Sequence, residues 1–126
     1  MDQQALIVAV RRELGHVVVT VIGEIDIATA AQLRDRLAGP VGGGQQVIVA
    51  LSGVDFIDAA GLGVLARAAA QAAVRGGGLQ LAAARRPVRR VLAVTGLDGS
   101  IPLAATVAEA EAALRAEPGT WANGGA

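Results

Sequence analysis

Two aspartates lie close together in the middle of the chain, between an apolar run and an alanine-rich segment. Asp55 and Asp58 belong to the stretch VIVALSGVDFIDAAGLGVLAR, which extends from Val47 to Arg67. Paired carboxylates can carry out general acid–base catalysis, but here no nucleophile or histidine accompanies them. An aspartate directly before a helix-forming segment commonly caps the helix by accepting hydrogen bonds from free backbone amides. We therefore expect Asp58 to be an N-cap and expect no catalytic residue in this chain.

The same stretch carries a glycine pattern that nucleotide-binding proteins also use. Gly61, Gly63 and Ala66 follow a predicted strand and open a predicted helix, which fits the looser form of the dinucleotide fingerprint. That fingerprint also requires an acidic residue about 20 positions later to bind a ribose, and no acid occurs between Asp58 and Asp98. We expect instead that the two glycines let the helix pack closely on the strand, and we expect no cofactor.

The other candidate residues lie outside this stretch. His16 is the single histidine; it lies in a predicted hairpin turn, where we expect it at the surface, and it cannot form a zinc site alone. Trp121 lies near the C-terminus and can either anchor a partner or pack back on the domain. Four arginines around Pro87 predict a solvated helix end or, alternatively, a contact with an acidic partner. These are Arg85, Arg86, Arg89 and Arg90.

The composition excludes several classes of protein. Of the 126 residues, 53% are hydrophobic and 17% charged, which is typical of a globular protein rather than a disordered one. The 11 basic and 11 acidic residues give no net charge, which argues against a nucleic-acid-binding protein. The absence of cysteine excludes disulfides, thiol catalysis and cysteine metal sites. We expect no metal.

The chain shows no feature that predicts insertion into a membrane. Arg67 and Arg75 interrupt the longest apolar candidate before it reaches the ~20 residues that a membrane span requires. No basic region precedes an apolar stretch at the N-terminus, so we expect no signal peptide. These features favour a cytoplasmic protein.

The first of the elements that we expect to position the central stretch is a β-hairpin near the N-terminus. Two β-branched runs, Ala5–Val10 and Val17–Ile22, predict strands joined by a turn in which Gly15 takes a positive φ. A helix follows over Ala28–Ala38, because Ile27, Ala30, Leu33 and Leu37 have helical spacing. Asp26 or Thr29 would cap this helix, and Gly39-Pro40 would end it.

The second half of the chain predicts three further strands and three helices. Val47–Leu51 is expected to be a central, buried strand, followed by a loop carrying Ser52, Asp55 and Asp58. The helix from about Ala59 to Val74 would lay Leu62 and Leu65 or Ala66 against that strand. The remaining elements are a strand over Leu79–Ala83, a helix over Pro87–Thr95, an edge strand over Ser100–Leu103 and a helix over Val107–Ala116. The order ββαβαβαβα predicts an α/β fold with a mixed sheet packed by about four helices.

Three sequence blocks together resemble the STAS family, which comprises anti-sigma factor antagonists and the cytoplasmic domains of sulfate transporters. The blocks are Gly23-Glu24-Ile25-Asp26, the run VDFIDAAGLGVL over Val54–Leu65, and Thr95-Gly96-Leu97-Asp98 with Pro102 after it. The resemblance extends from about Leu6 to Leu114. It implies a single STAS-like domain over residues 5–116, followed by a flexible tail over residues 117–126.

The resemblance also implies a function. It predicts a non-enzymatic protein that binds an anti-sigma factor, itself usually a serine kinase, and thereby frees a sigma factor. In the family, the kinase phosphorylates a serine or threonine just after the aspartate that matches Asp58, and phosphorylation ends the interaction. Here these positions are Ala59 and Ala60, so we expect no phosphorylation control at the usual site. The implied partner-binding residues are Glu24, Asp26, Asp58, Ala59, Ala60, Gly61 and Leu62.

Two alternatives remain open from the sequence. Family members also occur as subunits of lipid-transport ATPases and in stress-sensing complexes. The exposed N-terminus of the central helix can also bind a small molecule or nucleotide, which would make the protein a ligand-binding regulator.

Overall fold

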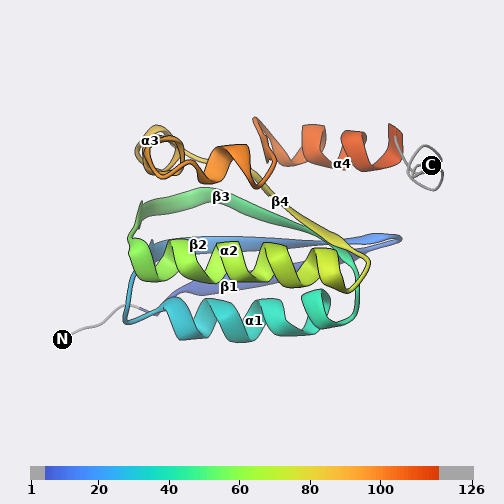
Figure 1. Ribbon diagram of the computed structural model, residues 1–126, viewed down its shortest axis with the longest axis horizontal. Helices are drawn as coiled ribbons and strands as arrows, with labels where there is room; N and C mark the ends of the chain where they lie inside the picture. Colours follow the sequence, from blue (N-terminus) through green and yellow to red (C-terminus); the bar gives the residue numbers. More distant parts are fainter. Residues whose placement is uncertain (1–4, 117–126) are drawn as a thin grey trace.

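The computed structural model describes residues 5–116 and contains a five-stranded mixed sheet whose strands lie side by side in chain order (Figure 1). β1 is antiparallel to β2, and the remaining neighbours are parallel. The strands are β1 (Ile7–Glu13), β2 (His16–Ile25), β3 (Gln46–Ile57), β4 (Gly78–Ala82) and β5 (Leu103–Ala104). The α/β class and the mixed sheet predicted from the sequence are therefore confirmed.

Three α-helices and one 3₁₀ turn connect the strands, and a fourth α-helix follows β5. In Figure 1 the first two helices lie side by side in one layer, and the last helix lies at the opposite side of the sheet. The helices are α1 (Ala30–Gly42), α2 (Ala59–Val74), α3 (Arg86–Val94) and α4 (Val107–Ala116), and the 3₁₀ turn is Leu97–Gly99. Both faces of the sheet are thus covered over part of their length, as the alternation of strands and helices requires.

The β1–β2 hairpin has the tight turn that the sequence predicts. Only Leu14 and Gly15 separate the two strands, and Gly15 has a φ of +93°, which an L side chain rarely adopts. The strands are longer than predicted, since pairing continues to Glu13 opposite His16.

The centre of the sheet confirms the prediction of a buried strand. β3 lies between β2 and β4, and every residue from Val47 to Leu51 is buried. Val47, Val49 and Leu51 pack with α1 and α2 in the larger core, whereas Ile48 and Ala50 pack in a smaller core against α4. Leu65 of α2 is fully buried in the larger core, while Leu62 and Ala66 are partly buried.

β3 continues past the predicted loop, so the expectation that Ser52 and Asp55 lie in a loop is wrong. The strand extends to Ile57 and stays paired with β2, with register shifts between Thr20 and Ile22 and between Gly23 and Glu24. An extra residue in a bulge changes which side chains of a strand face the core. The polar part of β3 after Leu51 can therefore stay paired with β2.

Two predicted boundaries also differ from the structure. α1 begins at Ala30 and passes through Pro40 to Gly42, because residues after the proline still bond back within the helix, as in the bond from the Gly43 N–H to the Gly39 carbonyl. The helical spacing predicts Ile27 on the buried face of this helix, but it precedes the helix and is 82% exposed. The last strand is Leu103–Ala104 rather than Ser100–Leu103.

The start of the outer strand is fixed by a side chain of α1. The Gln32 amide accepts a hydrogen bond from the Leu6 N–H at 3.1 Å and donates one to the Leu6 carbonyl at 2.8 Å. The buried Leu6 is thereby tied to the larger core at the beginning of β1. Residues 117–126 with Trp121, which the sequence assigns to a tail, lie outside the described residues.

Candidate functional site

The candidate site lies where β2 and β3 end side by side, at the edge of the sheet where β3 turns into α2 (Figure 1). In the parallel register Ile25 is paired with Ile57, and the Asp58 N–H donates to the Ile25 carbonyl at 3.1 Å. Asp26 and Asp58 therefore follow neighbouring strands at the same level. The carboxyl ends of parallel strands are where α/β proteins commonly place binding sites.

The Asp58 carboxylate caps α2, as the sequence predicts. Its Oδ1 accepts hydrogen bonds from the amides of Ala60 at 3.0 Å and Gly61 at 3.3 Å. Two of the free amides at the start of the helix are thereby satisfied. Asp58 is partly buried and has a structural role at this position.

Asp26 holds the neighbouring loop in a similar way. Its Oδ1 accepts hydrogen bonds from the Ala28 amide at 2.9 Å and the Thr29 amide at 3.1 Å. The buried Thr29 hydroxyl donates to the Glu24 carbonyl at 2.7 Å and accepts from the Asp26 amide at 3.0 Å. Thr29 occupies the N-cap position of α1 without a side-chain capping bond, so Asp26 organises this turn.

Gly61 allows the start of α2 to approach both strands. A Cβ atom there would lie 2.6 Å from Ile25 Cγ2 and 2.8 Å from Ile57 Cγ1, which leaves no room for a side chain. The close-packing role predicted for Gly61 is therefore confirmed. The same prediction is wrong for Gly63, where the nearest atom to a Cβ would be Arg67 Nη2 at 3.5 Å, on the same helix.

The outer surface of the site combines small, acidic and apolar groups. Glu24 and Ala59 are exposed, whereas Ala60 and Leu62 are partly buried and pack on the larger core. The structure thus places the seven residues of the predicted binding surface at one end of the sheet, with Gly61 beneath the surface. They are Glu24, Asp26, Asp58, Ala59, Ala60, Gly61 and Leu62.

Two large apolar side chains flank this surface and were missed from the sequence. Ile27 projects from the β2–α1 loop, and Phe56 at the end of β3 is 47% exposed. The signal for Phe56 is its place directly before the buried Ile57, because successive side chains of a strand point to opposite faces. Ile27 matches the helical spacing in the sequence, but the turn formed by Asp26 and Thr29 places it before the start of α1.

The second aspartate of the predicted pair is engaged elsewhere. Asp55 lies on β3 and forms an ion pair with Arg85, at 2.7 Å between Oδ1 and Nη1, with both side chains exposed. Asp55 and Asp58 therefore have different partners. In the arginine cluster, Arg89 donates to the Ala84 carbonyl at 3.0 Å, while Arg86 and Arg90 are exposed.

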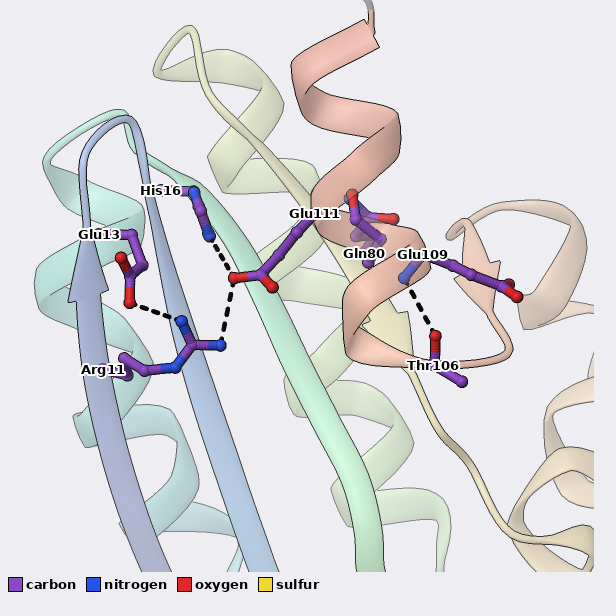
Figure 2. A network of polar contacts seen from close by, with 8 residues as sticks. Arg11, Glu13, His16, Gln80, Thr106, Glu109 and Glu111 are labelled. Atoms are coloured by element: carbon purple, nitrogen blue, oxygen red, sulfur yellow. Dashed lines mark hydrogen bonds and ion pairs between the residues drawn. The ribbon is translucent and has the colours of Figure 1, made fainter.

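His16 is not the surface residue that the sequence predicts. It is buried at the start of β2, because α4 covers it and Glu111 contacts it at 2.8 Å from Nε2 to Oε2 (Figure 2). A carboxylate only accepts hydrogen bonds, so Nε2 carries the proton. Arg11 approaches the same Oε2 at 3.1 Å and also pairs with Glu13. The hydrogen bond from His16, reinforced by Arg11, lowers the pKa of Glu111.

The described part of the chain lacks a metal-binding cluster and a membrane-spanning helix. Within residues 5–116 there is no group of three or more histidine, aspartate or glutamate side chains that could hold a metal ion. Over the same range, no helix has the length and apolar character needed to cross a membrane.

Comparison with known proteins identifies the family of this chain and a similar curated protein. The STAS domain model matches residues 8–110. The chain is 30% identical over 98 residues to the anti-sigma-B factor antagonist of Bacillus subtilis (strain 168), an alignment covering 78% of this chain and 90% of that protein.

Solved structures agree with this match. An anti-sigma factor antagonist from Mycobacterium paratuberculosis superposes with a TM-score of 0.80 and 33% identity, over 87% of this chain and 94% of that one. The Bacillus cell fate determinant SpoIIAA in its phosphorylated form has a TM-score of 0.65 and 22% identity, over 86% of this chain and 99% of that one, and shows the same fold.

Proposed function

The chain belongs to the STAS domain family, and we propose that it is an anti-sigma factor antagonist, a binding protein that frees a sigma factor by occupying its inhibitor. The observation that carries the proposal is the 30% identity to the anti-sigma-B factor antagonist, which extends over 90% of that protein. The antagonist from Mycobacterium paratuberculosis supports it at 33% identity with the same fold. This function places the protein in the cytoplasm and needs no catalytic residue.

We assign the anti-sigma-binding surface to the edge formed by the ends of β2 and β3 and the start of α2. Both aspartate carboxylates there already accept two backbone amides each, which favours a fixed recognition surface over a reacting group. The exposed Ile27 and Phe56 beside them provide the apolar contact area that protein interfaces bury. Glu24 adds an acidic group at the rim.

We further propose that the partner is an anti-sigma factor of the serine-kinase type and that this chain is not phosphorylated at the usual site. Ala59 is exposed at the first position of α2, where the family resemblance places the phosphate acceptor, and its methyl group has no oxygen to modify. Ala60 follows and also lacks an acceptor. The antagonist would therefore stay competent to bind whatever the state of the kinase.

Affinity capture from the native cell with the full chain tests this proposal. We expect the wild-type protein to recover an anti-sigma ATPase and Ala59→Glu to recover much less, because the new charge must be desolvated at the interface beside Asp58. Ala70→Glu is the matched control, since Ala70 is an exposed residue of the same helix, three turns from the site. Recovery of a membrane-transport ATPase instead, or equal capture by Ala59→Glu, would contradict the assignment.

A further inference from the structure

The start of α3 carries an exposed arginine cluster that the proposed binding surface does not include. Val88 and Leu92 are fully buried and define the inner face of the helix. With about 3.6 residues per turn, Arg86 and Arg90 lie one turn apart on the opposite face, which points to solvent. The four exposed members of the cluster are Arg85, Arg86, Arg89 and Arg90.

The stability of the helix does not account for the cluster. The N-terminal end of a helix carries a partial positive charge, so basic side chains are unfavourable there. Arg85 is the N-cap of α3, Arg86 is its first residue, and the first turn contains no acidic residue. Like charges four positions apart also repel, as in the pairs Arg85 with Arg89 and Arg86 with Arg90. The cluster therefore weakens α3 itself, which favours a role in contact with another molecule.

Most of the charge of the cluster is not neutralised within the domain. Among residues 5–116, Asp55 is the one acidic residue within 4 Å of the cluster, at 2.7 Å from Arg85. Arg89 donates to the Ala84 carbonyl at 3.0 Å, a bond that leaves its charge in place. Four arginines and one aspartate leave three positive charges at this place, on a chain whose net charge is zero.

The cluster lies next to the proposed anti-sigma-binding surface. In Figure 1, α3 lies at the same end of the sheet as the turn from β3 into α2. The ion pair with Arg85 joins the cluster to Asp55, and the exposed Phe56 follows directly on β3. Across the strands, Phe56 is paired with the exposed Glu24 of β2. Phe56 therefore lies between an acidic group on one side and the arginine cluster on the other.

Acidic proteins, nucleic acids and anionic lipids all attract arginines, and the structure favours the first. A basic amphipathic helix binds a membrane by inserting its apolar face, but in α3 that face, with Val88 and Leu92, lies in the core. Nucleic-acid binding depends on excess positive charge, and this chain has none. Arginine and aromatic side chains are enriched where proteins bind each other, and Phe56 provides the aromatic group.

We propose that the arginine cluster binds an acidic segment of a protein partner, in a contact that continues onto Phe56. Guanidinium groups bind carboxylates through charge-assisted, often bidentate hydrogen bonds. Because Glu24 carries the opposite charge on the other side of Phe56, the two signs fix the orientation in which the partner docks. Only the identification of this partner with the anti-sigma factor rests on the proposed function.

Titration of the full chain with octaglutamate, followed by amide NMR shifts, tests the proposal without the native partner. We expect saturable shifts on α3 and at Phe56 that weaken as salt is added, because exposed charges are screened. Octalysine should cause no shift on α3. Octaglutamate shifts confined to other elements would overturn the proposal, and so would tighter binding at α3 of a DNA duplex or of phosphatidylglycerol vesicles.

A double charge reversal and a matched control make the test specific. We expect Arg86→Glu with Arg90→Glu to bind octaglutamate about tenfold more weakly. Acidic side chains are favourable near a helix N-terminus, so this variant should unfold at no lower urea concentration than the wild type. Arg12→Glu with Arg75→Glu changes the net charge equally at exposed positions on β1 and after α2, and should bind like the wild type. Equal weakening in both variants, or none in either, would overturn the proposal.

Capture of the native partner separates this proposal from the proposed function. If the wild-type chain recovers an anti-sigma ATPase and Arg86→Glu with Arg90→Glu recovers much less, the cluster belongs to that interface. If no anti-sigma ATPase is recovered but octaglutamate binds at α3, the proposed function fails and the acidic-segment site stands. If octaglutamate does not bind at α3, the site is refuted whatever the capture recovers.

Discussion

Among single residues, Asp58 stabilises the fold through its capping bonds. Replacing it with alanine leaves the amides of Ala60 and Gly61 without their acceptor, so we expect Asp58→Ala to lower the free energy of unfolding by ~1 kcal/mol. Asp55→Ala removes the same charge from an exposed ion pair and should cost at most ~0.5 kcal/mol. Urea unfolding of both variants measures the difference. Equal losses would mean that the cap contributes nothing beyond charge.

For the two glycines of α2 we predict opposite effects of alanine substitution on the stability of the protein. Gly61→Ala places a methyl group against Ile25 and Ile57, and overpacking of this kind typically costs ~1–3 kcal/mol. Gly63→Ala meets only the flexible end of Arg67, so the better helix propensity of alanine should stabilise the protein by up to ~1 kcal/mol. Thermal or urea unfolding compares the pair. A stabilising Gly61→Ala would refute the close approach of helix and strands.

Among the elements, α4 depends on a charged contact as well as on its small apolar face. Ala110 is its one buried residue, and Glu111 joins it to His16 and Arg11 (Figure 2). We expect Glu111→Gln to lower the free energy of unfolding at neutral pH by ~0.5–1 kcal/mol, a value reduced by partial solvent screening. Glu109→Gln, two residues earlier and exposed, is the matched control.

The loss of unfolding free energy in Glu111→Gln should be present at neutral pH and disappear at acidic pH. Since the folded-state pKa of Glu111 is lowered from 4.5, its carboxylate stabilises the fold above pH 4.5, and this contribution disappears as the pH falls through the lower folded value. The wild-type and Glu111→Gln unfolding free energies should therefore converge as the pH falls from 4.5 through the folded-state pKa of Glu111. A difference that stays constant from pH 7 to pH 3 would show that the ionised carboxylate is not what holds α4.

Elements with local signals were predicted well, and those that depend on distant contacts were not. The Gly15 turn, the Asp58 cap and the burial of Val47–Leu51 follow from short patterns. The continuation of β3 to Ile57 was missed because its pairing with β2, not its own polar sequence, keeps it extended. The burial of His16 was missed because the residue that covers it, Glu111, lies 95 positions away.

The candidate site shows the same division between local signals and contacts between distant residues. Asp26 and Asp58 were found through their motifs, but their shared level at the sheet edge follows from the parallel register of Ile25 and Ile57. The exposure of Ile27 and Phe56 was missed because a hydrophobic side chain is expected in the core. Only the direction of the backbone shows that these two side chains point outward.

For the molecule as a whole, the proposed anti-sigma-binding surface and the contact between α4 and His16 lie at opposite ends of β2. The nine steps from His16 to Ile25 span about 30 Å of extended chain. Glu111→Gln should therefore leave partner binding unchanged, while changes at Ala59 alter it. Binding measured on the recovered partner with both variants checks this separation; a parallel loss in Glu111→Gln would show that the ends are coupled.

Restoring a hydroxyl at Ala59 should restore the modification. We expect the wild-type chain to remain unmodified after incubation with the partner kinase and ATP, and Ala59→Ser to gain one phosphate, detected by mass spectrometry. The phosphate adds about −1.5 to −2 charges at a helix N-terminus, which tolerates an anion, so unfolding should change little. Ala70→Ser controls for any accessible serine on the same helix.

A stoichiometric phosphate on the wild-type chain would contradict the loss of the switch. Ser52 is exposed on β3 and is the acceptor to examine first. Thr95 is a poorer acceptor, because its hydroxyl donates to the Val91 carbonyl at 2.8 Å.

The bond pair between Gln32 and Leu6 bears on how the protein avoids self-association. β1 is the outer strand of the sheet, and an outer strand with free backbone groups can recruit a strand from another molecule and start aggregation. At its apolar beginning the Gln32 amide satisfies both backbone groups of Leu6 as a neighbouring strand would, while Arg11, Arg12 and Glu13 place charges at its other end. A single side chain of α1 thus occupies the two backbone groups of Leu6 that a strand from another molecule would need in order to pair at the start of β1.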